Sequence, residues 1–233
     1  MVNEQFSRTA KVYGDEAVSK LKDKNVIVFG VGGVGGYVVE ALVRSGIGNI
    51  TVVDNDTIAL SNLNRQIIAL HSTIGEEKVD VIERRAKDIN PNVNVTKRKC
   101  FFLPENADSF DFSQYDYVVD AVDTVTAKIA IIEKANKEGV KVISCMGTGN
   151  KLNPMGFKVA YIEKTQVCPL ARVMRRELKN RNISKVKCVY SEEKPSITTH
   201  DAPGSVSFVP GAAGLLIASE VIKELIAQSM SIL

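Results

Sequence analysis

Five glycines follow a short apolar run and give the first chemical signal in this sequence. The stretch VIVFGVGGVGG places Gly30, Gly32 and Gly35 in the pattern G-x-G-x-x-G, and Gly33 adds further room. Glycines at this spacing let a backbone turn approach a phosphate closely, and the helix that follows supplies unpaired N–H groups. Asp54 ends the next apolar run and is placed to accept hydrogen bonds from ribose hydroxyls. The pattern predicts a nucleotide site rather than a ligand-free packing turn, and both NAD and ATP fit it.

Positive side chains in the segment that follows favour ATP over NAD. Arg65 follows Asn62 and Asn64, and Lys78 opens a helical pattern. Two cations near a phosphate turn suit a triphosphate, because its charge exceeds what one helix terminus can balance. Asp56 is included with these residues in the predicted nucleotide site. The alternative for Arg65 and Lys78 is that both are solvated surface charges.

Two aspartates at the end of a later apolar run predict a metal position. Asp120 and Asp123 lie at the carboxyl end of a predicted central strand, where ligands bind in open α/β sheets. A carboxylate at this edge can hold Mg²⁺ against the phosphates, since Mg²⁺ prefers hard oxygen ligands. We assign this role to Asp123 in preference to Asp120. The alternative for Asp123 is that it caps a helix starting at Thr124.

Short apolar runs alternate with helical patterns through the first 146 residues. This alternation predicts βαβ units, and hence a parallel sheet with helices on both of its faces. The predicted strands are 25–29, 50–53, 93–98, 116–119 and 140–144, and the predicted helices are 33–45, 73–89 and 124–138.

The sequence changes character at the turn-rich segment 147–156. We expect the later strands to extend the same sheet, in part antiparallel, which gives an α/β fold with a Rossmann-like, mostly parallel sheet. One domain is expected over residues 1–233, with a nucleotide-binding half, 1–146, and a substrate-binding half, 147–233. Strand-like runs lie at 157–164, 186–193 and 204–210, a basic helix near 169–181 and an apolar helix near 211–227.

Composition excludes several classes of protein. Apolar residues make up 45% and charged residues 24%, a balance that argues against disorder. The N-terminus lacks the apolar core of a secretory signal, and no apolar run is long and uncharged enough to predict a membrane span. The four cysteines form no C-x-x-C pair, so a structural zinc site has no support and a cytoplasmic location is expected.

Positive charge is concentrated in residues 164–187, which hold eight basic side chains and one acid in a chain of net charge +3. Arg172, Arg175, Arg176 and Lys179 are spaced to share one helix face. A row of cations on a docked helix predicts a track for nucleic-acid phosphates. The alternative is a solvated charged face, which is the usual fate of charge runs.

Three segments together resemble the ThiF/MoeB/HesA superfamily, which includes the ubiquitin-activating enzymes. They are GVGGVGGYVVEALVRSGIGNITVVDNDTIALSNLNRQ, GEEKVDVIERRAKDINP and VVDAVDTV. The resemblance implies that a substrate carboxylate attacks the α-phosphate of ATP, which gives an acyl-adenylate and pyrophosphate. By position it implies phosphate contacts for Gly32 and Gly33, a ribose contact for Asp54, triphosphate contacts for Asn62, Arg65 and Lys78, and Mg²⁺ binding by Asp123.

The N-terminal FSR resembles a segment in which members of the superfamily supply an arginine to the ATP site of the partner subunit. By this match Arg8 would act in trans, which implies a homodimer. The alternative is that Arg8 is a terminal charge without a role in the site.

Further segments resemble one subgroup of the superfamily, the tRNA threonylcarbamoyladenosine dehydratases. They are RTAKVYG, NLNRQIIAL, CVYSEE and GSVSFVPGAAGLLIASEVIKEL, and they span the whole chain. The resemblance implies that the threonine carboxylate of the modified nucleoside is adenylated, and that the neighbouring carbamoyl group closes a ring as AMP leaves. It implies tRNA as the partner, with no role for DNA or a membrane, and it requires no enzyme nucleophile.

Three other functions stay open, and one is a nucleotide-sensing module, since the sequence shows no obvious general base. An enzyme that activates the C-terminus of a small carrier protein would commonly carry two C-x-x-C pairs and a transfer cysteine, and would work with a sulfur-transfer protein. Cys168 at a predicted helix start is the candidate thiol, although a buried packing role is favoured for it and more so for Cys188. An NAD-binding oxidoreductase is disfavoured by the predicted cations. His200, in the polar THDAPGS, is a weaker site candidate.

Overall fold

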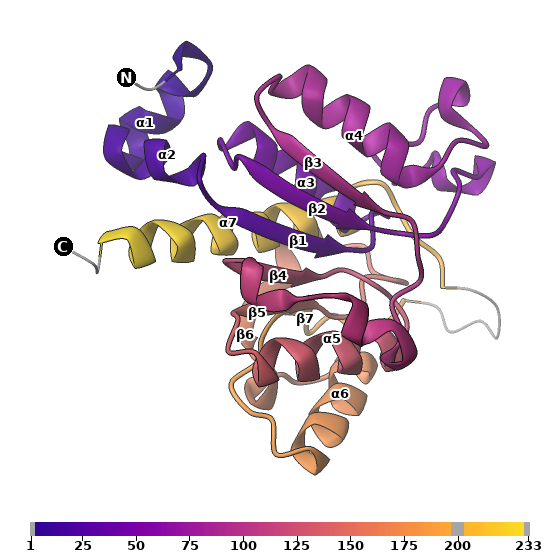
Figure 1. Ribbon diagram of the computed structural model, residues 1–233. Coiled ribbons are helices and arrows are strands. Elements are labelled where there is room, and N and C mark those ends of the chain that lie inside the picture. The colour runs from indigo at the N-terminus through magenta and orange to yellow at the C-terminus, as the bar shows by residue number, and fades with distance from the viewer. Residues whose placement is uncertain (1–2, 197–202, 231–233) are drawn as a thin grey trace.

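Within residues 3–196 and 203–230, which the computed structural model describes, seven strands form one sheet (Figure 1). They are β1 (Asn25–Phe29), β2 (Asn49–Val53), β3 (Asn94–Arg98), β4 (Tyr117–Asp120), β5 (Val142–Cys145), β6 (Phe157–Tyr161) and β7 (Lys187–Ser191). Their spatial order is β3-β2-β1-β4-β5-β7-β6. Every neighbouring pair is parallel except β6 and β7. The mostly parallel sheet is therefore confirmed, with antiparallel pairing confined to the edge strand β6.

Both faces of the sheet are covered by helices, as expected (Figure 1). Val26 and Val28 of β1 point into one core, whereas Ile27 and Phe29 point into the core on the opposite face. Successive side chains of a strand alternate between faces, so a strand covered on both sides is apolar throughout. The first face carries α2 (Asp15–Leu21), α3 (Gly35–Arg44), α4 (Lys78–Ile89) and α7 (Phe208–Met230), and the second carries α5 (Val125–Lys137) and α6 (Pro169–Asn180).

Two predicted elements differ from the structure. The helix predicted at 73–89 begins only at Lys78, because Gly75 adopts a φ of +87° in the turn before it. The strand-like run 204–210 was predicted wrongly: residues 204–206 join no strand, and α7 begins at Phe208. Pro210 explains this difference, since proline has no N–H to donate within a sheet but fits the first turn of a helix.

The first turns of α7 pack closely on α3. A Cβ at Gly214 would lie 2.4 Å from the carbonyl oxygen of Val34, and one at Gly211 would lie 3.2 Å from the ring of Tyr37. Glycine at these positions permits an approach that a side chain would block. The beginning of α7 is thereby brought beside the glycine-rich turn that follows β1.

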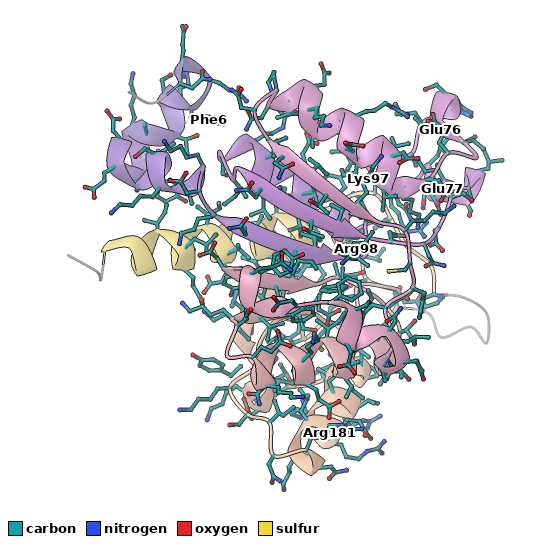
Figure 2. All side chains as sticks on the ribbon, viewed as in Figure 1. Phe6, Glu76, Glu77, Lys97, Arg98 and Arg181 are labelled. Atoms are coloured by element: carbon teal, nitrogen blue, oxygen red, sulfur yellow. The ribbon has the colours of Figure 1, made fainter. Side chains whose placement is uncertain are left out.

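The N-terminal helix α1 (Ser7–Tyr13) lies at the edge of the sheet where the strands begin (Figure 1). Phe6, labelled in Figure 2, packs against Gly46, and Gln5 Nε2 donates to the carbonyl of Ile89 at 2.6 Å. Gly46 and Ile89 precede β2 and β3, so α1 is remote from the edge where the strands end. None of the described helices is long and apolar enough to cross a membrane.

Candidate active site

The glycine turn after β1 divides into packing glycines and glycines that face the site. Gly30 has a φ of +84°, and a Cβ there would lie 2.8 Å from the carbonyl oxygen of Ala121. A Cβ at Gly35 would lie 1.8 Å from the Gly30 carbonyl oxygen, so packing alone requires glycine at both positions. Gly32 and Gly33 instead face the loop between β2 and α4. Gly32 and Gly33 therefore have room on the side of the predicted nucleotide, whereas Gly30 and Gly35 are packed against backbone, and the predicted nucleotide contacts of all four stay predictions.

Arg65 reaches this open side of the turn, as predicted. A Cβ at Gly33 would lie 3.3 Å from Cβ of Pro210 and 3.5 Å from Cγ of Arg65. The turn, the arginine and the first turn of α7 therefore meet at one place. α3 begins at Gly35 without a side-chain cap, which leaves its N-terminus available to an anion.

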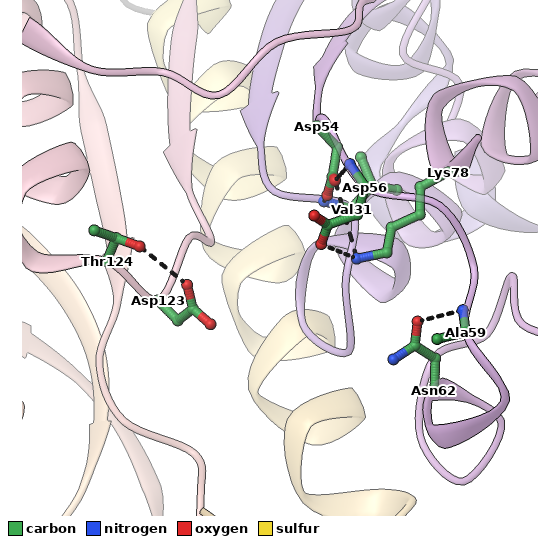
Figure 3. A network of polar contacts seen from close by, with 8 residues as sticks. All are labelled: Val31, Asp54, Asp56, Ala59, Asn62, Lys78, Asp123 and Thr124. Atoms are coloured by element: carbon green, nitrogen blue, oxygen red, sulfur yellow. Dashed lines mark hydrogen bonds and ion pairs between the residues drawn. The ribbon is translucent and has the colours of Figure 1, made fainter. Parts of the chain in front are cut away.

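Asp54, Asp56 and Lys78 form a connected cluster beside the turn (Figure 3). Asp54 Oδ2 accepts a hydrogen bond from the Val31 N–H at 2.7 Å, and its Oδ1 accepts one from the Asp56 N–H at 2.9 Å. Lys78 Nζ lies 2.7 Å from Asp56 Oδ2 and 3.9 Å from Asp54 Oδ1. Lys78 is buried, so the alternative that it is a solvated surface charge is wrong.

The loop between β2 and α4 is held by the side chains of its asparagines. Asn62 Oδ1 accepts from the Ala59 N–H at 3.1 Å, which shapes the loop itself (Figure 3). Asn64 Nδ2 donates to the carbonyl oxygen of Ser205 at 2.9 Å, and Arg65 Nη1 donates to Asn64 Oδ1 at 2.9 Å. Asn64 thus links Arg65 to the segment before α7, a connection that the sequence did not predict.

Gln66 is a candidate site residue that the sequence reasoning missed. Its side chain is buried, and its Nε2 lies 3.7 Å from where a Cβ of Gly32 would be. Its Oε1 is buried without a hydrogen-bond partner among the described residues. A buried acceptor left unpaired is costly, so an ordered water or a bound ligand is expected to supply the missing donor. Its position next to Arg65 was the only signal available in the sequence.

The two aspartates that follow β4 have different surroundings. Asp120 is fully buried and accepts hydrogen bonds from Lys128 Nζ at 2.9 Å and from Ser144 Oγ at 2.5 Å. Asp123 is exposed, and its Oδ1 has only a 3.4 Å contact with Thr124 Oγ1 (Figure 3). Thr124, rather than Asp123, is the residue that precedes α5 as its cap. Asp123 is therefore the carboxylate free to meet a cation, whereas Asp120 is occupied by Lys128.

No cluster of three or more potential metal-ligating side chains exists among the described residues. Mg²⁺ in nucleotide sites usually takes one or two carboxylates and completes its shell with waters and phosphate oxygens. The exposed carboxylate of Asp123 is compatible with that mode of binding. It could not hold Mg²⁺ without waters and phosphate oxygens.

Neither candidate cysteine is exposed enough to act as a nucleophile. Cys168 and Cys188 are buried, which agrees with the packing roles favoured for them. Burial raises the pKa of Cys188 to about 12, so its thiol stays protonated near neutral pH. His200 lies outside the described residues.

Arg8 is exposed on α1, at the edge where the strands begin. Its own subunit's nucleotide turn lies at the opposite edge. This placement excludes Arg8 from the site of its own chain, and the predicted action in trans stays a prediction.

The four predicted cations of α6 line a groove of about 630 Å³, together with apolar side chains such as Ile162 and Ile183. Arg172, Arg176 and Lys179 are exposed. Arg175 differs, because it is half-buried and its Nη1 donates to the carbonyl of Thr165 at 2.7 Å. Three of the four predicted cations are therefore exposed to a partner, although Arg176 also pairs with Glu177, and Arg175 instead braces the helix.

Glu177 is the one acid in the basic segment, and two arginines bind it. Arg176 Nη2 and Arg181 Nη1 each lie 2.9 Å from its carboxylate. Arg181, labelled in Figure 2, also bridges to Glu133 of α5. Glu177 is thus neutralised locally, and the groove is lined by four cations and one acid, Glu163.

Comparison with known proteins places this site in a family. The model of the ThiF family matches residues 6–232. A tRNA threonylcarbamoyladenosine dehydratase of Bacillus subtilis (strain 168) is 39% identical over 240 residues, covering 95% of this chain and 94% of the relative. One of Escherichia coli (strain K12) is 35% identical over 198 residues, covering 82% of this chain and 74% of the relative.

Solved structures agree with the sequence comparison. The E. coli tRNA N6-threonylcarbamoyladenosine dehydratase in complex with ATP gives a TM-score of 0.91 at 33% identity, covering 98% of this chain and 96% of that one. E. coli MccB with ATP shares the fold, with a TM-score of 0.71 at 23% identity over 97% of this chain and 64% of that one. By the family match and the identity along nearly its whole length, the chain belongs to the ThiF family.

Proposed function

We propose that this protein is an ATP-dependent tRNA threonylcarbamoyladenosine dehydratase. The observation that carries the proposal is 39% identity to the B. subtilis dehydratase over 95% of the chain. The site supports it, because Arg65 and Lys78 converge on a glycine turn with Asp54 beside them. An NAD-binding oxidoreductase is disfavoured, because the two phosphates of NAD need fewer cations than Arg65 and Lys78 supply beside the helix terminus.

The first step is adenylation. An oxygen of the threonine carboxylate attacks the α-phosphorus of ATP, the bond to the bridging oxygen of the β-phosphate breaks, and pyrophosphate leaves. Gly32 and Gly33 admit the phosphates, Asp54 accepts from the ribose hydroxyls, and Arg65 and Lys78 balance the charge that grows on the leaving group. Gln66 supplies an acceptor or donor at the same turn.

The second step closes a ring. The carbamoyl group of the nucleoside attacks the activated carbonyl carbon and loses a proton, while AMP departs with one of the original carboxylate oxygens. The nucleoside thereby loses the elements of water, and ATP is converted to AMP and pyrophosphate. Because the nucleophile belongs to the substrate, the buried thiols of the enzyme are not required.

Two further components belong to the proposal. Mg²⁺ would neutralise phosphate charge when bound, with Asp123 as its protein ligand, supported by the exposure of that carboxylate. A homodimer in which Arg8 completes the site of the partner subunit is supported by the position of α1, remote from its own nucleotide turn. The enzyme would act in the cytoplasm, where tRNA is modified.

The groove beside α6 is the proposed tRNA surface, with Arg172, Arg176 and Lys179 as its phosphate-binding cations. α6 begins next to the edge where β5 ends, since a Cβ at Gly147 would lie 3.8 Å from Sγ of Cys168. From there the groove follows α6 toward Ser184, which precedes β7, so an RNA on it would approach the active edge at the Arg172 end.

The decisive experiment incubates the protein with ATP and tRNA that carries threonylcarbamoyladenosine, then measures AMP and the mass of the modified nucleoside. Loss of one water, with AMP formed in equal amount, is the expected result. Two controls are tRNA that lacks the modification and the Lys78→Ala variant. ATP consumption without loss of water from the nucleoside would contradict the proposal.

A second candidate is adenylation of the C-terminus of a small carrier protein, in concert with a sulfur-transfer protein. It is favoured by 37% identity to the adenylyltransferase and sulfurtransferase UBA4 of Vanderwaltozyma polyspora, over 62% of this chain and 34% of that protein. AMP formation that depends on a carrier protein ending in Gly-Gly, and not on tRNA, would establish it.

A further inference from the structure

Residues 203–205, here called the strap, join two loops that lie far apart in the sequence. At one end, Asn150 N donates to the carbonyl of Gly204 at 2.8 Å, and Asn150 Oδ1 accepts from the Gly204 N–H at 2.7 Å. Asn150 also has a φ of +56°, a conformation that asparagine tolerates better than most residues. The paired bonds fix Gly204 against the loop that follows β5.

Close packing reinforces this attachment. A Cβ at Gly149 would lie 2.6 Å from Cβ of Pro203 and 3.6 Å from the carbonyl oxygen of Gly204. The shorter distance leaves no room for a side chain at Gly149, because the Pro203 ring packs directly on its backbone. The position of the strap is therefore set by Asn150 and its neighbour.

The other end of the strap holds the nucleotide loop. Asn64 Nδ2 donates to the Ser205 carbonyl, and Asn64 Oδ1 accepts from Arg65 Nη1, both at 2.9 Å. An amide that is bonded at both its nitrogen and its oxygen cannot rotate without breaking one of the bonds. Arg65 Nη1 has two acceptors, the Ser61 carbonyl and Asn64 Oδ1, each at 2.9 Å, and the strap sets the position of the second through the Ser205 carbonyl.

We propose that Asn150 is a positioning residue for Arg65, acting through Gly204, Ser205 and Asn64. It lies in the half of the chain expected to bind the substrate, whereas Arg65 lies in the half expected to bind ATP. The continuous path of hydrogen bonds makes ATP binding depend on the loop after β5. The inference rests on the proposed function only in taking ATP as the ligand of Arg65.

Two substitutions at one position separate this role from simple folding. Asn150→Gly keeps the positive φ and removes the side-chain acceptor, whereas Asn150→Asp keeps an acceptor and still tolerates that φ. We expect Asn150→Gly to weaken ATP binding about tenfold, the scale of one lost hydrogen bond, with the melting temperature little changed. Asn150→Asp should restore most of the affinity.

A background that lacks the arginine gives the sharper test. In Arg65→Ala, Asn150 has no arginine to position. Adding Asn150→Gly to that variant should therefore leave its dissociation constant for ATP unchanged. Coupled positions behave in this non-additive way, and independent ones multiply their effects. Asn64→Asp, which keeps the acceptor for Arg65 but loses the donor to Ser205, should weaken binding in the same direction as Asn150→Gly.

The outcomes are distinct. If Asn150→Gly binds ATP as the wild type does, or if its effect is undiminished in Arg65→Ala, Asn150 does not position Arg65 and the inference is overturned. If the wild-type protein itself fails to bind ATP by calorimetry, the proposed function fails instead. Non-additive loss with recovery in Asn150→Asp establishes the role.

Discussion

Lys78 and Asp56 form an ion pair in which a buried ammonium meets an exposed carboxylate. Their Nζ and Oδ2 atoms are 2.7 Å apart, yet the lysine side chain is 6% exposed and that of the aspartate is 59% exposed. A buried charge is costly without a partner, so Asp56 serves as that partner in the absence of a ligand. A phosphate that binds at the glycine turn would replace Asp56 as the partner of Lys78. Water could then solvate the exposed Asp56 carboxylate.

Lys78→Ala should therefore lower AMP formation by at least about 100-fold, the scale seen when a single stabilising cation or donor is removed from a reaction site. The chain should remain folded, because the closer partner, Asp56, is exposed and can be hydrated once the ammonium is gone. Lys97→Ala is the matched control, since Lys97 is a surface lysine paired with Asp80 and Glu83 (Figure 2). Turnover in Lys78→Ala equal to that of the control would remove Lys78 from the site.

Gln66→Leu should separate stability from function. Leucine has a similar volume and removes the buried acceptor that is unpaired within the described part of the chain, so the free energy of unfolding should stay the same or rise. ATP binding should weaken about tenfold, since the ligand would lose a hydrogen-bond partner. Thermal unfolding and calorimetry check the two halves of this prediction, and unaltered affinity would mean that Gln66 is only a packing residue.

The aspartates after β4 should respond differently to the same substitution. Asp123→Asn should raise the Mg²⁺ concentration needed for half-maximal AMP formation and leave the melting temperature unchanged. Asp120→Asn should instead destabilise the fold by about 3 kcal/mol, because it leaves the fully buried Lys128 without its counter-charge. A normal Mg²⁺ dependence in Asp123→Asn would rule out the assigned metal role.

Local spacing was enough to predict the glycine turn, Asp54 at the end of β2, and most of the helices and strands. Each depends on residues that are close in the sequence, and on periodicities that a strand or helix imposes on its own side chains. The strand predicted at 204–210 was wrong. Val206, Phe208 and Val209 are typical of a strand, but Pro210 cannot donate within a sheet and lies in the first turn of α7.

The remaining features depend on how distant segments pack, which local spacing does not record. Asn64 meets Ser205 across 141 positions, so a predicted nucleotide ligand proved to be bonded to the segment before α7. Arg175 lies on the predicted basic face of α6, yet its guanidinium donates a hydrogen bond to the carbonyl of Thr165. The burial of Gln66 and of Asp120 likewise follows from packing. Burial places Gln66 at the glycine turn and leaves Asp120 paired with Lys128.

Glu40 on α3 gives a prediction about pH. Its burial alone would raise the pKa of this carboxyl, but hydrogen bonds from Arg85 and Arg44 hold the pKa below its ordinary value of 4.5. Because the pKa is depressed in the folded state, this group stabilises the fold above about pH 4.5 and loses that contribution as the pH falls further.

Glu40→Gln should therefore lower the free energy of unfolding by about 2 kcal/mol at pH 7, the scale of hydrogen bonds to a charged group. The difference from the wild type should shrink as the pH falls below 4.5, because the wild-type carboxyl then becomes protonated and neutral like the glutamine amide. Denaturant titrations over this range measure it, and a difference that is constant with pH would contradict the assignment.

The exposed cations of α6 give the last prediction. Arg172→Glu with Arg176→Glu should weaken tRNA binding more than about tenfold and reduce the slope of log affinity against log salt by about 2, one for each lost phosphate contact. Affinity for free ATP should not change. Arg175 is left intact, because its bond to Thr165 would confound the result with stability. The matched control reverses two exposed cations on α4, Arg84→Glu with Lys87→Glu, for the same change in net charge. Equal losses in both double variants would reveal a non-specific charge effect, and tRNA would then dock elsewhere than on the α6 groove.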